Sequence, residues 1–442
     1  MRSALEAAGP GLLSLRAPCK TIIESRGGNG VVKTLRSVVI DSQLVTITAL
    51  LSLFGLAMVY SAGQTDIKTA AASAYKSQAM WLLIGVVSTY GLLKMPVRFI
   101  RWATWPAYLF TLALLLSLLV LGVGSGANGH TRSWLAIAGH RLGQPAEFAK
   151  LTVVLMLAKV LSESPQSPKS LLDLWKPALV VGLPWLLIML QPDLGSSIVF
   201  IGIFFGMLYW SGVAWPMLLL IASPAISLLL SFSVGLWGAW FFILLALVLW
   251  YRPYLIEGIV LMVLNVATGV IAPMMWEKMA PYQQNRLKVF IDPSADPRQS
   301  GYHVLQSKIA IGSGGMFGNG FTLGTQKRSG FLPEQHTDFI FAVVGEELGF
   351  IGVTVALTLF LALLLRATGI AARANDSFSS LVAYGLMSSW LVHVAVNIGM
   401  TLNLMPIVGI PLPFFSYGGS MMLASWLSVG VLLRIAGEGR GH

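Results

Sequence analysis

Long apolar runs follow one another along most of this chain, separated by short stretches that are polar or rich in glycine and proline. A helix needs about 20 apolar residues to cross a bilayer core about 30 Å thick, so such runs predict membrane-spanning helices. Twelve spans are predicted, at residues 43–62, 78–93, 102–122, 147–161, 172–190, 195–211, 215–234, 236–251, 255–276, 339–366, 379–397 and 405–433. The pattern therefore predicts an all-α polytopic membrane protein with one membrane domain, residues 41–435.

The polar segments predict how this bundle lies in the membrane. Residues 1–40 form a leader, 436–442 a short tail, and 277–338 the one long connection. Lys and Arg are concentrated in the leader, the tail and the short loops on their side, which predicts a cytoplasmic location for both ends. The long connection then faces the extracytoplasmic side, and a loop of this length in a compact bundle is usually functional.

Composition excludes several classes of protein. Of the 442 residues, 56% are hydrophobic and 11% charged, whereas a soluble domain carries roughly a quarter charged residues. The lone cysteine, Cys19, gives no disulfide framework. The net charge of +11 could suggest nucleic-acid binding, but the chain has no basic domain with interleaved aromatic residues. Membrane topology and an anionic lipid substrate explain the positive charge better.

Two aspartates in the long loop are each followed by proline, Asp292 and Asp296. A helix cannot run through these prolines, so turns hold the carboxylates. Asp-Pro is a common turn initiator in any loop. An aspartate near cationic groups at a lipid headgroup could instead act as a general base, while the cations hold a phosphate. The nearby cations are Arg286, Lys288, Arg298 and Lys308.

A glycine-rich stretch, 312–324, follows in the same loop and leads to Glu334, His336 and Asp338. It has neither a Walker sequence nor a dinucleotide fingerprint, which argues against a nucleotide site. Close packing of re-entrant backbone is the favoured interpretation, with a phosphate nest as the alternative. His336 and Asp338 alone are a weak signal for a metal ion.

Charged residues also occur at or inside the predicted spans. Glu147 and Lys150 lie three residues apart, so they share a helix face and can pair; a functional role and a snorkelling anchor are equally open. Glu346 and Glu347 lie about 100° apart on a helix, so at most one is expected to face a cavity while the other pairs with a basic residue or is protonated. The Pro- and Gly-rich stretch 397–420 must be buried or line a cavity.

Several of these motifs, taken in sequence order, resemble the SEDS family (shape, elongation, division and sporulation proteins). The matching segments extend from about residue 38 to 435. They are Asn128-Gly with Arg132, Gln144-Pro-Ala-Glu with Lys150, Gln191-Pro-Asp-Leu-Gly, the string from Arg286 to Gly352, and Pro413-Phe-Phe-Ser-Tyr-Gly-Gly. Within the family, segments 301–315 and 324–326 resemble the elongation branch more than the division branch.

The resemblance implies a peptidoglycan glycosyltransferase that polymerises lipid II, a disaccharide-pentapeptide on undecaprenyl pyrophosphate. Asp296 would be the general base, and Glu147 and Lys150 the family's acidic and basic pair. The substrate-binding residues implied are Arg132, Glu147, Lys150, Arg286, Gln306, Lys308, Glu334, His336, Asp338 and Ser416. No cofactor is certain, although a divalent Mg²⁺ or Mn²⁺ ion could sit at the phosphates.

The same resemblance implies the bacterial inner membrane, a class B penicillin-binding protein as partner, and an elongation complex around both. Two departures stand out. Ser133 separates Arg132 from Trp134, where the family has Arg directly followed by Trp. The family usually has about ten spans, and the stretch 236–276 adds two; an even insertion leaves the catalytic loop on its side.

Three other functions stay open. A transporter of lipid II or another undecaprenyl-linked lipid would use the same broken helices, and would depend on Glu346 or Glu347 more than on Asp296. A division polymerase would share the chemistry. A non-catalytic scaffold for the penicillin-binding protein would need neither carboxylate.

Overall fold

A computed structural model describes residues 41–66, 70–124, 133–137, 140–164, 167–279, 284–285, 288–290, 292, 300–332 and 334–439. All of them belong to one compact unit, Val38–His442. The predicted leader, the tail end at 440–442, and Arg132, Arg286 and Asp296 lie outside the described residues.

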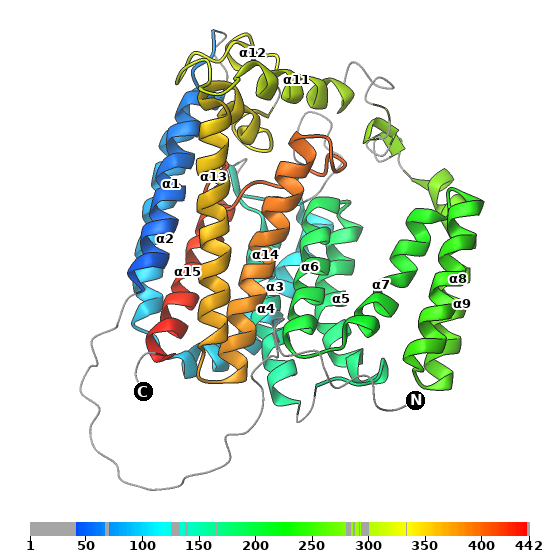
Figure 1. Cartoon of the computed structure of the whole chain (residues 1–442). Helices are drawn as coiled ribbons and strands as arrows, with labels where there is room; N and C mark the ends of the chain where they lie inside the picture. The colour runs from blue at the N-terminus through cyan, green and yellow to red at the C-terminus, as the bar shows by residue number, and fades with distance from the viewer. Residues whose placement is uncertain are drawn as a thin grey trace, which may run out of the picture. The chain divides into compact units, whose positions relative to one another are not determined.

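Long α-helices dominate this part of the chain (Figure 1). Those before the long loop are α1 (Ser42–Ala62), α2 (Ala74–Leu93), α3 (Val97–Leu121), α4 (Pro145–Glu163), α5 (Trp175–Leu190), α6 (Leu194–Trp210), α7 (Trp215–Leu230), α8 (Val234–Tyr251) and α9 (Leu255–Lys278). The long loop contains α11 (Ser300–Ser313) and α12 (Thr325–Arg328), and after it come α13 (Ile340–Ala372), α14 (Ser377–Thr401) and α15 (Gly419–Gly439).

Each of the twelve predicted spans overlaps one of these helices. Within the described residues, eight helices are long and apolar enough to cross a membrane, and α6 and α7 are shorter apolar helices. Of the remaining two, α4 includes four charged residues: Glu147, Lys150, Lys159 and Glu163. The protein is therefore a multi-pass membrane protein, as predicted.

A short antiparallel hairpin between α3 and α4 was not predicted. Strand β1 (Leu135–Ile137) pairs with β2 (His140–Gly143), with Ala136 opposite Arg141. Outside this pair, Val123 bridges to Trp134. Strands this short give no alternating pattern that can be recognised in a sequence.

The start of the last predicted span was wrong. Residues 405–418 are not helical, and α15 begins only at Gly419. Prolines at 406, 411 and 413 exclude a regular helix, and Gly409 (φ +71°) and Phe414 (φ +65°) lie in the left-handed region. Most of the segment 407–416 is buried, as predicted for irregular backbone in a membrane protein.

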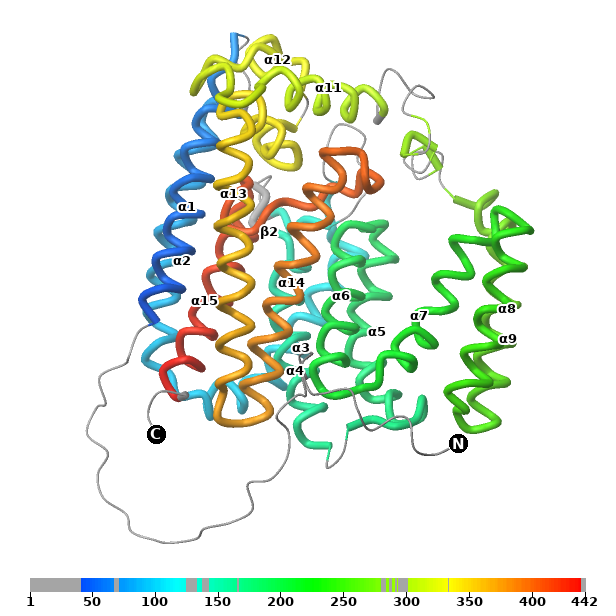
Figure 2. Tube along the Cα trace, viewed as in Figure 1, coloured from blue at the N-terminus to red at the C-terminus, as the bar shows by residue number. Residues whose placement is uncertain are grey.

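The glycine-rich stretch packs against a break in α13. Gly349 has φ +62° and ψ −158°, and the N–H groups of Phe350 and Ile351 donate instead to Gly315 O and Met316 O, at 2.9 and 3.2 Å. A Cβ on Gly318 would lie 2.0 Å from Glu347 O. The prediction of closely packed backbone in this stretch is therefore confirmed. In Figure 2, α11 and α12 lie at the same end of the bundle as the start of α13.

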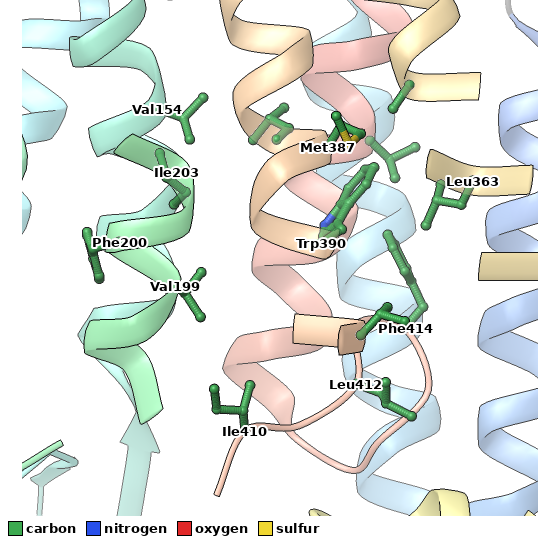
Figure 3. Packing of buried hydrophobic residues seen from close by; sticks show 14 of the residues in the cluster. Val154, Val199, Phe200, Ile203, Leu363, Met387, Trp390, Ile410, Leu412 and Phe414 are labelled. Carbon is green, nitrogen blue, oxygen red and sulfur yellow. The ribbon is translucent and has the colours of Figure 1, made fainter. Parts of the chain in front are cut away.

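Burial separates a central group of helices from a peripheral one. In their most apolar windows, α14 is 72% and α15 78% buried, whereas α8 is 6% buried. Trp390 of α14 packs edge to face with Phe414, 5.4 Å between ring centroids, among residues of α4, α6, α13 and the segment 407–416 (Figure 3). The central helices therefore provide a rigid frame for a site.

Polar contacts attach α8 and α9 to α7. Asn265 Nδ2 donates to Ser223 Oγ at 2.8 Å, and Trp237 Nε1 donates to Ser227 Oγ at 3.0 Å. Such interhelical hydrogen bonds hold helices together where lipid supplies no hydrophobic driving force. The two additional helices predicted at 236–276 are present, and α9 leads into the long loop.

Candidate active site

An ion pair is buried near the start of α4. Pro145 occupies the first turn, where its missing N–H costs nothing. Glu147 and Lys150 follow on one face, with Lys150 Nζ 2.6 Å from Glu147 Oε1 and each residue no more than 5% exposed. The predicted pairing is confirmed. Full burial argues against a snorkelling anchor, since such a lysine keeps its ammonium in water.

A histidine on α14 completes this group. His393 Nε2 lies 3.0 Å from Lys150 Nζ, and His393 Nδ1 lies 3.0 Å from Pro411 O. His393 was not predicted as a site residue. The signal that could have found it is its position four residues before Asn397, on the same face of a predicted span.

The three side chains border a small cavity of about 20 Å³ between α4, α14 and α15, which has room for about one water-sized group. Its lining combines these ionisable groups with serine hydroxyls and apolar residues. The residues are Glu147, Lys150, Leu151, Leu386, Ser389, Trp390, His393, Met421, Ala424, Ser425 and Ser428. A buried cation on the wall of so small a cavity suits a single anionic oxygen that reaches into it.

The starts of α4, α6 and α15 are joined by hydrogen bonds. Gln144 Nε2 donates to Asp193 Oδ2 at 2.8 Å, and Gln144 N donates to Ser420 Oγ at 3.3 Å. Asp193 caps α6 by accepting from Ser196 N at 3.0 Å. Three sequence motifs that lie far apart along the chain therefore meet beside the Glu147–Lys150 pair.

The segment that carries Glu334, His336 and Asp338 is tied to the same helices. Asn397 Nδ2 donates to Asp338 O at 2.9 Å and to Ile410 O at 2.7 Å. The N–H of Tyr417 donates to His336 O at 2.9 Å. Burial lowers the pKa of His336, against the opposing effect of the Glu334 carboxylate, so the imidazole is neutral at pH 7.

Two other predicted binding residues occupy different surroundings. Lys308 is exposed on α11, which is anchored through Ser307 Oγ donating to Thr401 O at 2.8 Å; Gln306 on the same helix is partly buried. Ser416 is 2% exposed, and its Oγ accepts from Leu412 N at 2.9 Å, which shapes the turn before α15. Substrate contacts by these residues stay predictions.

The adjacent carboxylates of α13 are both fully buried. Glu347 forms an ion pair with Lys327 of α12, which also donates to Ser61 O at 2.7 Å. Glu346 accepts from Gln326 N at 2.7 Å. The expected pairing with a basic residue is confirmed, although Lys327 was not foreseen as the partner. Neither carboxylate lines the cavity beside Lys150.

Residues that could hold a metal ion do not gather within the described part of the chain. No three His, Cys, Asp or Glu side chains there come close enough to form such a site. His336 and Asp338 thus supply at most part of a donor set, and a divalent ion stays a prediction.

Comparison with known proteins gives matches along almost the whole chain. The family described as "Cell cycle protein" (FtsW, RodA and SpoVE) matches residues 41–239 and 237–441. "Peptidoglycan glycosyltransferase MrdB" of Escherichia coli K12 is 35% identical over 398 residues, 90% of this chain and 93% of that protein. "Stage V sporulation protein E" of Bacillus subtilis is 37% identical over 402 residues, 90% and 96% of the two chains. "Peptidoglycan glycosyltransferase RodA" of Treponema pallidum is 32% identical over 423 residues, 89% and 96%.

Solved structures share the fold. A chain from "Structural coordination of polymerization and crosslinking by a peptidoglycan synthase complex" superposes with a TM-score of 0.68 at 26% identity, covering 92% of this chain and 100% of that one. The crystal structure of Thermus thermophilus RodA gives 0.60 at 26% identity, covering 92% and 99%.

Proposed function

The chain belongs to the FtsW/RodA/SpoVE family, also known as SEDS, and we propose that it is a peptidoglycan glycosyltransferase that polymerises lipid II. The observation that carries this proposal is the buried Glu147–Lys150–His393 group beside a cavity between α4, α14 and α15. An ammonium held there by a carboxylate and an imidazole can bind an anionic phosphate oxygen of a polyprenyl-linked donor that reaches into the cavity.

Asp296 is the proposed general base. It takes the proton of the acceptor sugar hydroxyl as that oxygen attacks the anomeric carbon of the donor. The new glycosidic bond forms while the bond from the anomeric carbon to the phosphate oxygen breaks, and the electron pair leaves with undecaprenyl pyrophosphate. Lys150, together with Arg132, Arg286 and Lys308, compensates the charge that develops on the phosphates.

Placement in the membrane follows from the order of the spans. Twelve spans put both ends of the chain on one side and the long loop, after the ninth, on the other. With the predicted cytoplasmic location of the Lys- and Arg-rich ends, the loop with Asp296 faces the extracytoplasmic side of the bacterial inner membrane. The acceptor glycan and the donor headgroup are then on the same side as the base.

The proposed partner is a class B penicillin-binding protein, with lipid II as substrate and an elongation complex as the setting. Support comes from the fold shared with a chain of a peptidoglycan synthase complex that coordinates polymerisation and crosslinking. Relatives bear both RodA and FtsW names. Segments 301–315 and 324–326 favour the elongation role over the division role.

Polymerisation of purified lipid II by the purified protein with its transpeptidase tests this function. A ladder of glycan strands on a gel is the expected product. Movement of labelled lipid II between vesicle leaflets without any glycan would instead support the transporter. Absence of both activities, with an intact complex, would support the scaffold.

A further inference from the structure

The two ring nitrogens of His393 have partners of opposite character. Nδ1 lies 3.0 Å from the carbonyl oxygen of Pro411, and Nε2 lies 3.0 Å from Lys150 Nζ. A carbonyl oxygen can only accept a hydrogen bond, so Nδ1 carries the proton. The lone pair of Nε2 then faces the ammonium and accepts from it. A neutral imidazole satisfies both contacts at once.

Lys150 thereby has two of its three N–H groups engaged. One donates to Glu147 Oε1 at 2.6 Å and a second to His393 Nε2. Among the described residues, the structure gives Lys150 no third hydrogen-bond partner, and Lys150 itself lines the cavity. Because two bonds in different directions fix a tetrahedral ammonium, the direction of the third N–H is fixed as well.

We propose that His393 is a positioning residue that orients the Lys150 ammonium into this cavity, where it meets one anionic phosphate oxygen of a polyprenyl pyrophosphate. The proposal rests on the proposed function only in the identity of the ligand. Without the Nε2 acceptor, the ammonium would swing toward Glu147 and lose its fixed direction. A second cation at position 393 would repel it.

The position of His393 also links the cavity to the rest of the site. Its contact with Pro411 and the contacts of Asn397, one turn further along α14, hold the segment 407–411 in place. Asn397 holds Asp338 as well. The imidazole is therefore fixed by backbone that does not belong to its own helix, as a residue that positions another side chain requires.

Binding of undecaprenyl pyrophosphate to the full-length protein in lipid nanodiscs tests the proposal, with undecaprenol as the probe that lacks phosphates. The variants are His393→Leu, Lys150→Met, the double variant, and His393→Gln, whose amide can both accept from Lys150 and donate to Pro411 O. Ser380→Ala, which removes the acceptor of Trp210 Nε1 at the other end of α14, is the matched control. Thermal melting checks that each variant is folded. If His393→Leu does not fold, His393→Phe replaces it.

His393→Leu should weaken pyrophosphate binding about tenfold, the usual effect of one hydrogen bond to a charged group. It should leave undecaprenol binding unchanged and add nothing to Lys150→Met, whereas His393→Gln should restore affinity. Additive losses in the double variant, or a His393→Gln variant as weak as His393→Leu, would overturn the proposal. Polymerisation by the wild type is scored separately. If the wild type makes glycan but the affinity losses of the two single variants add in the double variant, only the role of His393 is refuted. If the affinity losses do not add but the wild type makes no glycan, only the proposed polymerase function is refuted.

Discussion

At the scale of single residues, Lys150 is the side chain on which the proposed function of the cavity depends most. Removing one partner of a buried ion pair leaves an uncompensated charge that costs about 3–5 kcal/mol. Lys150→Ala should therefore abolish polymerisation and also lower the melting temperature. The matched control is the double variant Glu147→Gln/Lys150→Met, which removes both charges and should recover stability but not activity. A double variant that polymerises lipid II at the wild-type rate would limit the pair to a structural role.

His336 gives a prediction about pH. Burial lowers its pKa in the folded protein, whereas in the unfolded chain it keeps a value of about 6.5. Below that value the unfolded chain binds the proton more readily, so His336 makes the protein less stable as the pH falls from 7 toward 5. His336→Gln should reduce this loss, measured as melting temperature against pH. If the melting temperature of His336→Gln depended on pH in the same way as that of the wild type, His336 would have the same pKa in the folded and unfolded chain.

The ion pair of α4 could be predicted from the sequence because a spacing of three residues on a helix fixes which side chains meet. The contacts of Lys150 with His393 and of Glu347 with Lys327 could not. The first contact joins helices that are hundreds of residues apart in the sequence, and the second joins helices separated by an irregular loop. No local spacing of residues therefore encodes either contact. Asp296, Arg132 and Arg286 lie outside the described residues, and their roles stay predictions from the family motifs.

At the scale of elements, the break in α13 depends on glycine in the facing loop. Gly318→Ala would place a Cβ 2.0 Å from Glu347 O at a φ of +79°. Backbone strain of this kind costs about 1–3 kcal/mol, so the variant should melt at a lower temperature. Gly312→Ala is the control, because nothing lies within 4 Å of its Cβ and α11 favours alanine there. Equal melting temperatures for the two variants would show that the loop adjusts freely.

Element positions were predictable wherever apolar runs are long, which is why each of the twelve spans overlaps a helix. The predictions were wrong where the chain is apolar but not helical. Residues 405–418 read as part of the last span, yet their prolines force an irregular path that buried hydrogen bonds from Gln78 and Asn397 make possible. The hairpin β1–β2 is too short to leave a pattern.

At the scale of the whole molecule, the even number of spans predicts that both ends of the chain lie on one side, and their Lys and Arg residues predict that this side is the cytoplasm. In a Cys19→Ser background, a cysteine at Gln283 should react with a membrane-impermeant maleimide in intact cells. A cysteine at Gly441 should react only after the inner membrane is permeabilised. If the cysteine at position 441 reacted in intact cells and the cysteine at position 283 did not, the predicted topology would be reversed and the long loop would lie in the cytoplasm.

The most direct measurement of the central claim is the rate of glycan formation from lipid II by Asp296→Asn beside Asp292→Asn. The two aspartates share their chemistry and the proline that follows, so each controls for the other. Loss of the general base should slow Asp296→Asn by at least about a hundredfold, with membrane insertion and partner binding preserved. Asp292→Asn should remain much closer to the wild type, because its role is to shape a turn. Wild-type polymerisation by Asp296→Asn, or equal rates for the two variants, would contradict the assignment of Asp296 as the catalytic base.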